Sequence, residues 1–177
     1  IRKSKDDQFV LVHDDSLGRL TGEDAIVADL TVAQLKKEKL LFKGKETTDV
    51  ILTLDEVLET YEGDFIFYLD NKIKTLKAAE DLAQVIERHD AYTSVVVACT
   101  DFFFIAYLEL KHPEINTVLE GFTPGKELFY KLLPGKLKPD FIASFASDID
   151  ADHVQWLKKN NLLNKRIIQI QNTYSEI

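Results

Sequence analysis

Four polar residues of this 177-residue chain follow apolar stretches, and their types suit proton transfer and phosphate binding. His13 and Asp14 end one apolar run, and Asp70 and Lys72 end another. A histidine exchanges protons near neutral pH, and an adjacent carboxylate can orient or charge its ring. A carboxylate can hold Mg²⁺ or Ca²⁺, and a lysine ammonium can hold a phosphate oxygen. These residues are the candidates for a reaction centre.

Each candidate also has an ordinary structural explanation. A histidine that caps a strand and bonds a loop carbonyl would account for His13, because a His-Asp dipeptide alone is unspecific. Asp70 and Lys72 are two residues apart, so a strand would project both to the same face. They would form either a strand-end ion pair or part of a solvent-filled mouth, and the apolar run before them leaves these two interpretations balanced.

Several other reactive residues are expected to be structural. Cys99 is predicted to be a small core residue at the end of an apolar strand. Trp156 is expected to pack its helix against the sheet. The remaining histidines are expected on solvated helix surface: His89, His112 and His153.

The elements that must position the candidates alternate between apolar runs and amphipathic stretches. Strands are predicted at 9–12, 65–69, 94–100, 115–122, 140–145 and 166–171. Helices are predicted at 30–40, 53–63, 75–90, 101–113, 125–138 and 150–161. Thr53 and Glu56 have the spacing of a capping box at one helix start. The later strands end in residues to which no role is given: Cys99-Thr100, Glu120, Ser144 and Gln171-Asn172.

This regular strand–helix order predicts an α/β fold built from parallel βαβ units. Either an open doubly wound sheet or a closed (β/α)8 TIM barrel suits the order, and no glycine-rich nucleotide loop follows any strand. A full barrel typically needs about 250 residues, and about six strands can be counted here. The chain also contains no Met. We therefore expect residues 1–177 to form a single partial barrel domain of a longer protein, with the first strand and the last strand missing.

Composition narrows the classes of partner. The net charge of −8 argues against nucleic acid or an anionic membrane surface as the main partner. No apolar run approaches the ~20 residues of a membrane span. The single cysteine excludes an internal disulfide framework and suits either a reducing cytoplasm or a cysteine-poor bacterial exterior. We expect a small-molecule substrate, while the compartment and the oligomeric state stay open.

The stretch "HDDSLGRLTGEDAIVADLTVAQLKK", residues 13–37, resembles the glycerophosphodiester phosphodiesterase family. That family characteristically has His-Asp, then a Leu-x-Arg-x-Thr segment with glycine, then Leu-Thr and a short helix. The segment "TLDEVLE", residues 53–59, is similar to the family's next helix, with Leu52 where proline is usual. "FYLDNK", residues 67–72, looks like the family's strand that ends in carboxylate-x-Lys.

The resemblance implies a (β/α)8 barrel that binds one divalent cation, Mg²⁺ or Ca²⁺, at its mouth. It implies hydrolysis of a glycerophosphodiester to glycerol 3-phosphate and an alcohol, with two histidines as general acid and base. His13 would be the second of those histidines, Asp70 a metal ligand and Lys72 a phosphate contact. The cation and Lys72 would offset the charge that develops in phosphoryl transfer.

Departures from the family pattern keep other functions open. The family's first histidine and a Glu-x-Asp pair would lie before Ile1, and Asp70 stands where the family usually has the longer Glu. One alternative is a non-catalytic phosphate-binding barrel module of a larger, possibly membrane-associated protein. Another is a different hydrolase on the same barrel, acting on inositol or sphingolipid phosphodiesters; the Leu-x-Arg-x-Thr segment ranks it last.

Overall fold

A computed structural model describes residues 1–61, 63 and 65–169 of the chain. A curled sheet of five parallel strands dominates it, in the order β5-β6-β7-β8-β9. The strands are β5 (Phe67–Asp70), β6 (Val95–Cys99), β7 (Asn116–Glu120), β8 (Phe141–Phe145) and β9 (Arg166–Gln169). Because neighbouring strands are parallel and consecutive in sequence, all of their carboxyl ends reach the same edge of the sheet.

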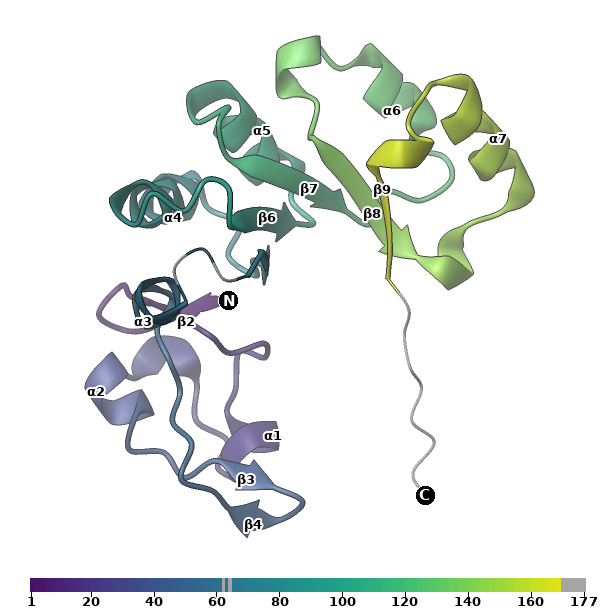
Figure 1. Ribbon diagram of the computed structural model, residues 1–177. Coiled ribbons are helices and arrows are strands. Elements are labelled where there is room, and N and C mark those ends of the chain that lie inside the picture. Colours follow the sequence, from purple (N-terminus) through teal and green to yellow (C-terminus); the bar gives the residue numbers. More distant parts are fainter. Residues whose placement is uncertain (62, 64, 170–177) are drawn as a thin grey trace.

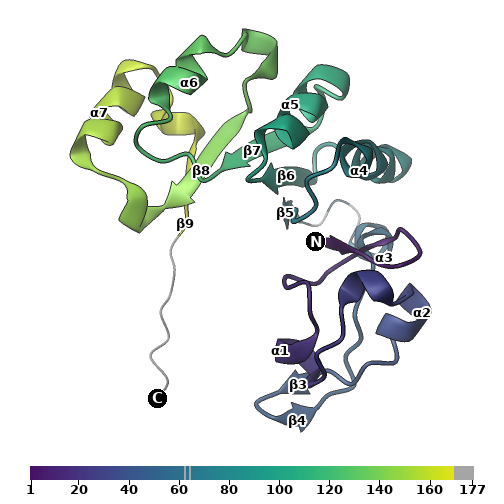
Figure 2. The same ribbon diagram turned by 180° about the vertical axis from the view of Figure 1, so that it is seen from behind.

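Helices connect the strands and cover one face of the sheet. They are α4 (Leu76–Arg88), α5 (Phe102–Lys111), α6 (Glu127–Leu132) and α7 (Ala151–Lys159). Figures 1 and 2 show these four helices as an arc along the outer side of the strands. The arrangement is half of a barrel wall. Which strands would complete it stays a prediction.

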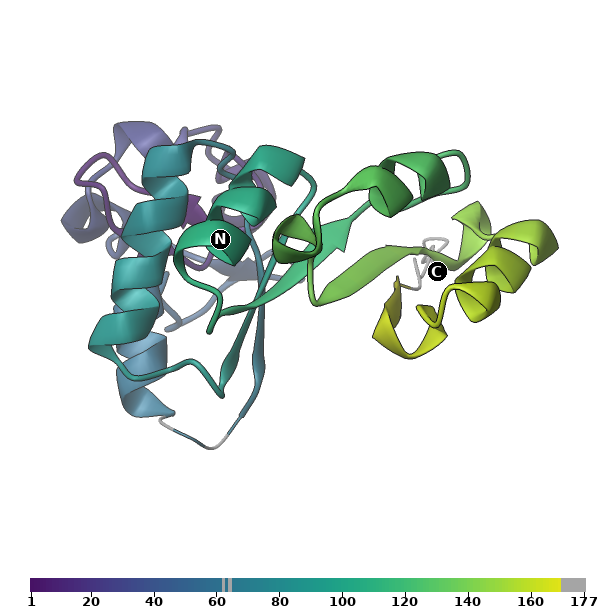
Figure 3. The same cartoon turned by 90° about the horizontal axis from the view of Figure 1, so that it is seen from above.

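Short elements make up the N-terminal region, residues 1–61. They are β1 (Arg2–Lys3), β2 (Phe9–Val10), α1 (Gly18–Thr21), α2 (Val32–Leu35), β3 (Leu41–Phe42), β4 (Lys45–Glu46) and α3 (Leu54–Thr60). Seen from above in Figure 3, this purple-to-blue region crowds against the α4 end of the sheet, while the green and yellow elements extend away. Four 3₁₀ turns complete the described structure: Val27–Asp29, Gly135–Leu137, Ala146–Asp148 and Leu163–Lys165.

Helix starts follow the capping rules visible in the sequence. Thr53 and Glu56 form the predicted reciprocal capping box at α3, and Thr31 forms another with Gln34 at α2. Thr75 caps α4, and Asp101 and Asp150 cap α5 and α7. These local bonds satisfy backbone N–H groups that the first turn of a helix leaves free.

The two faces of the sheet bury different side chains. On the outer face, strand residues such as Val97 and Leu119 pack with α4 and α5 in the main hydrophobic core. On the inner face, Ala98, Val118 and Ala143 form a smaller cluster of mostly short side chains. Short residues on the inner face leave room above them, toward the carboxyl ends of the strands, for longer polar side chains.

The prediction of a barrel strand at 9–12 is wrong. Only Phe9 and Val10 are in a strand, and they pair antiparallel with Arg2 and Lys3 in a short hairpin. Three residues of the run are buried, because Phe9 contacts the main core while Val10 and Val12 pack in a second cluster with Leu17, and Leu11 is exposed. Burial by loops and short helices therefore produced the same pattern as burial in a sheet.

Two other strand predictions need adjustment. The strand predicted at 65–69 begins later, because β5 starts at Phe67, and Phe65 and Ile66 are exposed. Tyr68 is also exposed, because it points to the concave face of the half-barrel. The last predicted strand corresponds to β9 as far as Gln169, and its expected end at Gln171-Asn172 lies outside the described residues.

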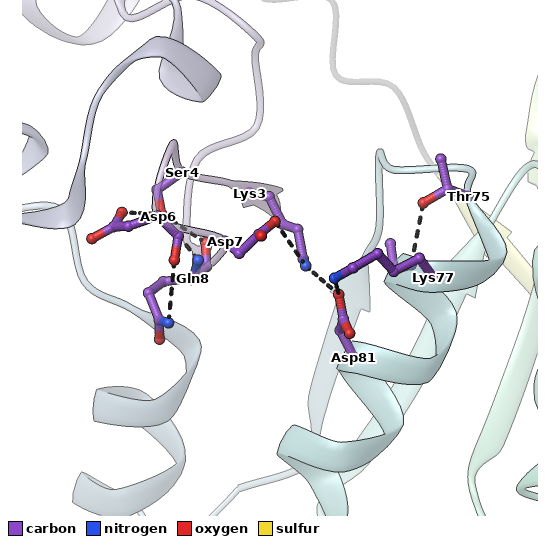
Figure 4. A network of polar contacts seen from close by, with 9 residues as sticks. Lys3, Ser4, Asp6, Asp7, Gln8, Thr75, Lys77 and Asp81 are labelled. Carbon is purple, nitrogen blue, oxygen red and sulfur yellow. Dashed lines mark hydrogen bonds and ion pairs between the residues drawn. The ribbon is translucent and has the colours of Figure 1, made fainter.

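Polar contacts attach the N-terminal hairpin to α4 (Figure 4). Lys3 of β1 bonds the carboxylate of Asp81, which also pairs with Lys77 at 2.6 Å, and Lys3 approaches Asp7 at 3.4 Å. Within the turn, the Ser4 hydroxyl donates to Asp6 at 2.7 Å. We call Lys3, Lys77 and Asp81 the hairpin clamp. Through the hairpin it fixes the chain that leads to His13.

Candidate functional site

A cavity of about 480 Å³ opens at the carboxyl ends of the strands, on the concave side of the sheet. Three of the four candidate residues contribute to its lining, namely His13, Asp70 and Lys72, and the fourth, Asp14, does not. The other lining residues are Thr100, Glu120, Gly121, Ser144, Phe145, Asp148 and Gln169. The structure thus brings the predicted residues His13 and Lys72, which are 59 positions apart in the sequence (from 13 to 72), to one cavity.

Hydrogen bonds orient the His13 ring. Its Nδ1 lies 2.7 Å from an oxygen of Asp14, and the other oxygen of Asp14 accepts a 2.8 Å bond from Arg19 Nε. Arg2 Nε donates to the His13 carbonyl at 3.1 Å. With Nδ1 turned to Asp14, Nε2 faces the cavity 3.7 Å from Asp70 Oδ2. An imidazole that donates from Nδ1 keeps Nε2 as its free proton acceptor.

The carboxylate of Asp14 stays ionised under ordinary conditions. The hydrogen bond from Arg19, followed by that from His13, lowers the pKa of Asp14 from 3.8 to about 2. A permanent negative charge beside Nδ1 favours one orientation of the ring and stabilises it when it is protonated. Arg19, Asp14 and His13 form a chain of contacts that leads from the surface to the cavity.

Asp70 and Lys72 form the ion pair that one of the two interpretations predicted. Lys72 Nζ lies 2.6 Å from Asp70 Oδ2, although Lys72 lies beyond the end of β5. Asn71, between them, is buried on the opposite side, where its amide oxygen accepts a bond from the Ile73 N–H. This local turn directs Lys72 back toward Asp70. The pair lies in the cavity wall, so both interpretations describe part of what is observed.

Asp70 has one oxygen that could bind a cation. Its Oδ1 is buried and has no hydrogen-bond partner, which is unusual for a carboxylate. A divalent ion of the Mg²⁺ or Ca²⁺ type binds such oxygens. Within the described residues, however, no group of three or more His, Cys, Asp or Glu side chains could hold a metal. Asp70 therefore fits one ligand of a cation, and the described chain does not provide a full coordination shell.

Glu120 is a site residue to which the sequence analysis gave no role. It ends β7 inside the cavity and is only 9% exposed. Its Oε1 accepts bonds from Tyr68 Oη at 2.9 Å and from Gln169 Nε2 at 2.7 Å. Burial and the neighbouring Glu120 charge raise the pKa of Tyr68. The available signal was a carboxylate directly after an apolar strand, the same signal that identified Asp70.

The other histidines lie away from this cavity. His89 bonds Asp55 at 2.8 Å, and His112 bonds Glu80 at 2.9 Å, each between neighbouring helices. The expectation of a solvated His153 is wrong: it is 1% exposed. Its two ring nitrogens contact Glu127 at 2.7 Å and Arg166 at 2.9 Å, so a buried polar network replaces water.

Cys99 and Trp156 have the structural positions that were predicted. Cys99 is fully buried in the main core, and burial raises the pKa of its thiol, which makes it a poor nucleophile. Trp156 packs partly buried against the core cluster beneath α6 and α7.

Solved structures share this fold over nearly the whole chain. A glycerophosphoryl diester phosphodiesterase from Parabacteroides distasonis aligns with a TM-score of 0.72 and 23% identity over 96% of this chain and 58% of its own. An Oleispira antarctica phosphodiesterase in complex with the product sn-glycerol-3-phosphate aligns with a TM-score of 0.75 and 17% identity. The alignment covers 96% of this chain and 69% of that protein. A glycerophosphodiester phosphodiesterase from Thermotoga maritima aligns with a TM-score of 0.69 and 23% identity. The alignment covers 98% of this chain and 71% of that protein. The chain thus spans about three fifths to seven tenths of these proteins.

Sequence comparison identifies the family. The profile of the glycerophosphoryl diester phosphodiesterase family matches residues 1–120, about two thirds of the chain. No match was found among curated proteins. The matched segment contains His13, Asp70, Lys72 and Glu120, whereas the cavity residues beyond Glu120 lie outside it. Its sequence and its half-barrel fold together show that this chain belongs to the glycerophosphoryl diester phosphodiesterase family.

Proposed function

We propose that this protein hydrolyses glycerophosphodiesters to glycerol 3-phosphate and an alcohol, with His13 as a general acid–base residue. The observation that carries the proposal is the position of His13 Nε2, which faces Asp70 beside Lys72 in a cavity at the carboxyl ends of the strands. Family membership and the neighbour that was solved with sn-glycerol-3-phosphate support the same reaction.

The described side chains have separate tasks in this reaction. Lys72 binds a non-bridging phosphate oxygen and orients the diester. His13 exchanges a proton at Nε2, while Asp14 holds Nδ1 and keeps the ring directed into the cavity. Asp70 would hold a divalent cation through Oδ1. Such a cation, when bound, stabilises the negative charge that develops on the phosphoryl oxygens.

A variant of His13 tests the proposal. We expect His13→Ala to lower the rate of glycerol 3-phosphate release by the full-length protein about 10²- to 10⁴-fold, the usual contribution of acid–base catalysis. The side chain is 63% exposed, so the unfolding transition should barely change. His112→Gln, a histidine far from the cavity, serves as the matched control. A near-normal rate in His13→Ala would contradict the acid–base assignment.

Cation binding is tested separately from turnover. Asp70→Asn should weaken binding of Mg²⁺ or Ca²⁺, measured by titration calorimetry on the folded protein. Asp49→Asn, an exposed carboxylate outside the cavity, should leave that affinity unchanged. Equal cation affinities for the Asp70 variant and the unaltered protein would remove Asp70 as a ligand.

A non-catalytic phosphate-binding module is the second candidate. The closed Asp70–Lys72 ion pair favours it. This candidate predicts that glycerol 3-phosphate binds and that Lys72→Met weakens its affinity, while the full-length protein releases no product from any glycerophosphodiester.

A further inference from the structure

A second, smaller cavity of about 180 Å³ lies between α6 and α7 and shares no lining residue with the cavity of the candidate site. We call it the basic hollow, because Lys131 and Lys138 are the only charged side chains among its described lining residues. Its other lining residues are Tyr130, Trp156, Asn160 and Leu162. Two lysines beside aromatic and amide groups suit an anionic ligand of the size of a phosphate group.

The positive charge of the hollow is not neutralised by neighbouring carboxylates. Among the described residues, neither lysine forms an ion pair, and Lys138 Nζ lies 5.0 Å from the centre of the Tyr130 ring. The segment 125–138 contains four lysines and one acidic residue, in a chain whose net charge is −8. That acidic residue, Glu127, bonds the buried His153 at 2.7 Å. The segment is therefore a positive region on an acidic protein.

Two carboxylates act on the hollow from behind Tyr130. Burial, followed by the charges of Glu109 and Asp140, raises the pKa of Tyr130. Both carboxylates are bonded to Thr117, and neither lines the hollow. The described lining thus presents two ammonium groups and no carboxylate to a ligand.

Exposed apolar side chains continue this surface across α6 to the start of α5. Leu128 and Leu132 lie one helical turn apart, and both are exposed. Phe129 packs on Phe102 of α5 with ring centres 4.9 Å apart, and Phe102 packs on the exposed Phe103 at 5.7 Å. We call Phe103, Leu128, Phe129 and Leu132 the apolar ridge. Contiguous exposed apolar groups of this kind mark an interaction surface.

Lys131 joins the ridge to the hollow. It lies on α6 between Leu128 and Leu132 in sequence, and it lines the hollow. Exposed Leu and Phe side chains flanked by lysines are typical of segments that lie in a membrane interface, where Trp and Tyr rings are also enriched. A two-fold contact between copies of the chain would instead bring identical lysine-rich segments together, which charge repulsion opposes.

We propose that the apolar ridge and the basic hollow dock this protein on an anionic lipid surface. The ridge enters the boundary between headgroups and acyl chains, and the hollow receives a lipid phosphate between Lys131 and Lys138. The net charge of −8 does not prevent docking, because charges farther than about 8–10 Å from the lipid are largely screened at physiological salt. The inference is independent of the proposed function, since no residue of the ridge or the hollow lines the cavity of the candidate site.

Sedimentation with lipid vesicles tests the proposal on the full-length protein. One set of vesicles contains phosphatidylcholine alone, and the other contains phosphatidylcholine mixed with the anionic phosphatidylglycerol. We expect binding to the mixed vesicles to be about tenfold stronger or more, and to weaken as salt is added. Equal binding to the two sets of vesicles, or binding to neither, would overturn the inference.

Variants assign the binding to this surface. Lys131→Gln combined with Lys138→Gln should weaken binding to the mixed vesicles about tenfold, and Leu128→Ser should weaken it several-fold. The matched controls are Lys45→Gln and Phe42→Ser in the hairpin of β3 and β4, which lies far from α6 in both views (Figures 1 and 2). Phe42 is 68% exposed and Leu128 is 67% exposed. Equal losses in the controls and in the α6 variants would contradict the proposal.

Other occupants of the surface give different results. A dimer in the absence of lipid, detected by light scattering and abolished by Leu128→Ser, would show that a second copy covers the ridge and would overturn the proposal. Calorimetric binding of inorganic phosphate, together with equal binding to the two sets of vesicles, would show a site for free phosphate and would also overturn it.

Turnover separates this inference from the proposed function. The α6 variants should release glycerol 3-phosphate from a water-soluble glycerophosphodiester at the unaltered rate while they lose vesicle binding. Selective binding to mixed vesicles by a protein without turnover would support the docking surface and contradict the hydrolytic function. Turnover without such binding would do the reverse.

Discussion

The N-terminal region and the sheet region, residues 67–169, position their functional residues by different means. In the sheet region, hydrogen bonds between parallel strands fix the ends of β5 and β7, and therefore Asp70 and Glu120. His13 lies in a bend of the N-terminal region, beyond a two-residue strand. Its place depends on side-chain contacts: Asp14 and Arg2 around it, and the hairpin clamp behind it. The site therefore combines residues positioned by strand pairing with a histidine positioned by side-chain contacts.

Core substitutions should show the largest difference between the regions. Leu82 of α4 is fully buried in the main core, and Leu17 is fully buried in the separate N-terminal cluster. We expect Leu82→Ala to lower the free energy of unfolding by about 2–5 kcal/mol, because it leaves a cavity between α4 and the sheet. Chemical denaturation followed by circular dichroism measures this loss.

Leu17→Ala is the matched substitution in the other region. We expect it to reduce hydrogen-exchange protection mainly in the N-terminal region, because the N-terminal cluster shares no buried residue with the main core. If protection fell equally in β6 and β7, the two regions would unfold as one unit and the proposed contrast would be wrong.

Loss of the contacts that orient the His13 ring should have an intermediate effect, which is measured on the reaction rate. Arg19→Gln removes the bond to Asp14 Oδ2 but no residue of the cavity lining. We expect kcat to fall about tenfold, about 1.4 kcal/mol in activation free energy, with little change in KM. Arg19→Lys keeps the positive charge and should recover part of the rate. A change confined to KM would show that Arg19 acts on substrate binding instead.

The hairpin clamp should contribute the smallest effect. We expect Asp81→Asn to lower the free energy of unfolding at pH 7 by about 1 kcal/mol, since the carboxylate loses two lysine partners near the surface. A larger loss, or one equal to that of the exposed Asp152→Asn control, would contradict this account of the clamp.

The contribution of the clamp should also depend on pH. Burial opposes ionisation of Asp81, but the hydrogen bonds from Lys3 and Lys77 outweigh it and lower the pKa of the carboxyl below 3.8. A folded-state pKa below the unfolded value gives stability that is present above pH 3.8 and is lost as the pH falls through the folded-state pKa. The difference between Asp81→Asn and the unaltered protein should therefore shrink in acid.

Local sequence patterns determined much of this protein. The capping boxes at Thr31 and Thr53 fix helix starts through bonds within four residues. The two-residue spacing of Asp70 and Lys72 predicted that they share a face, and they do form an ion pair, although Lys72 lies beyond the end of β5. The alternation of strand and helix identified the α/β class, and motif resemblance identified the family. All of these depend on residues that are neighbours in the chain.

Tertiary structure alone decided the rest, because it depends on which distant segments become neighbours. The apolar run at residues 9–12 looked like a barrel strand, and only the pairing with Arg2 and Lys3 shows a short antiparallel hairpin. His153 is buried because Glu127 and Arg166 meet it from other elements. Glu120 joins Tyr68 and Gln169 only because parallel strands bring positions 52 and 49 residues apart to one edge. No local pattern encodes that meeting, so the contacts of Glu120 became visible only in the folded chain.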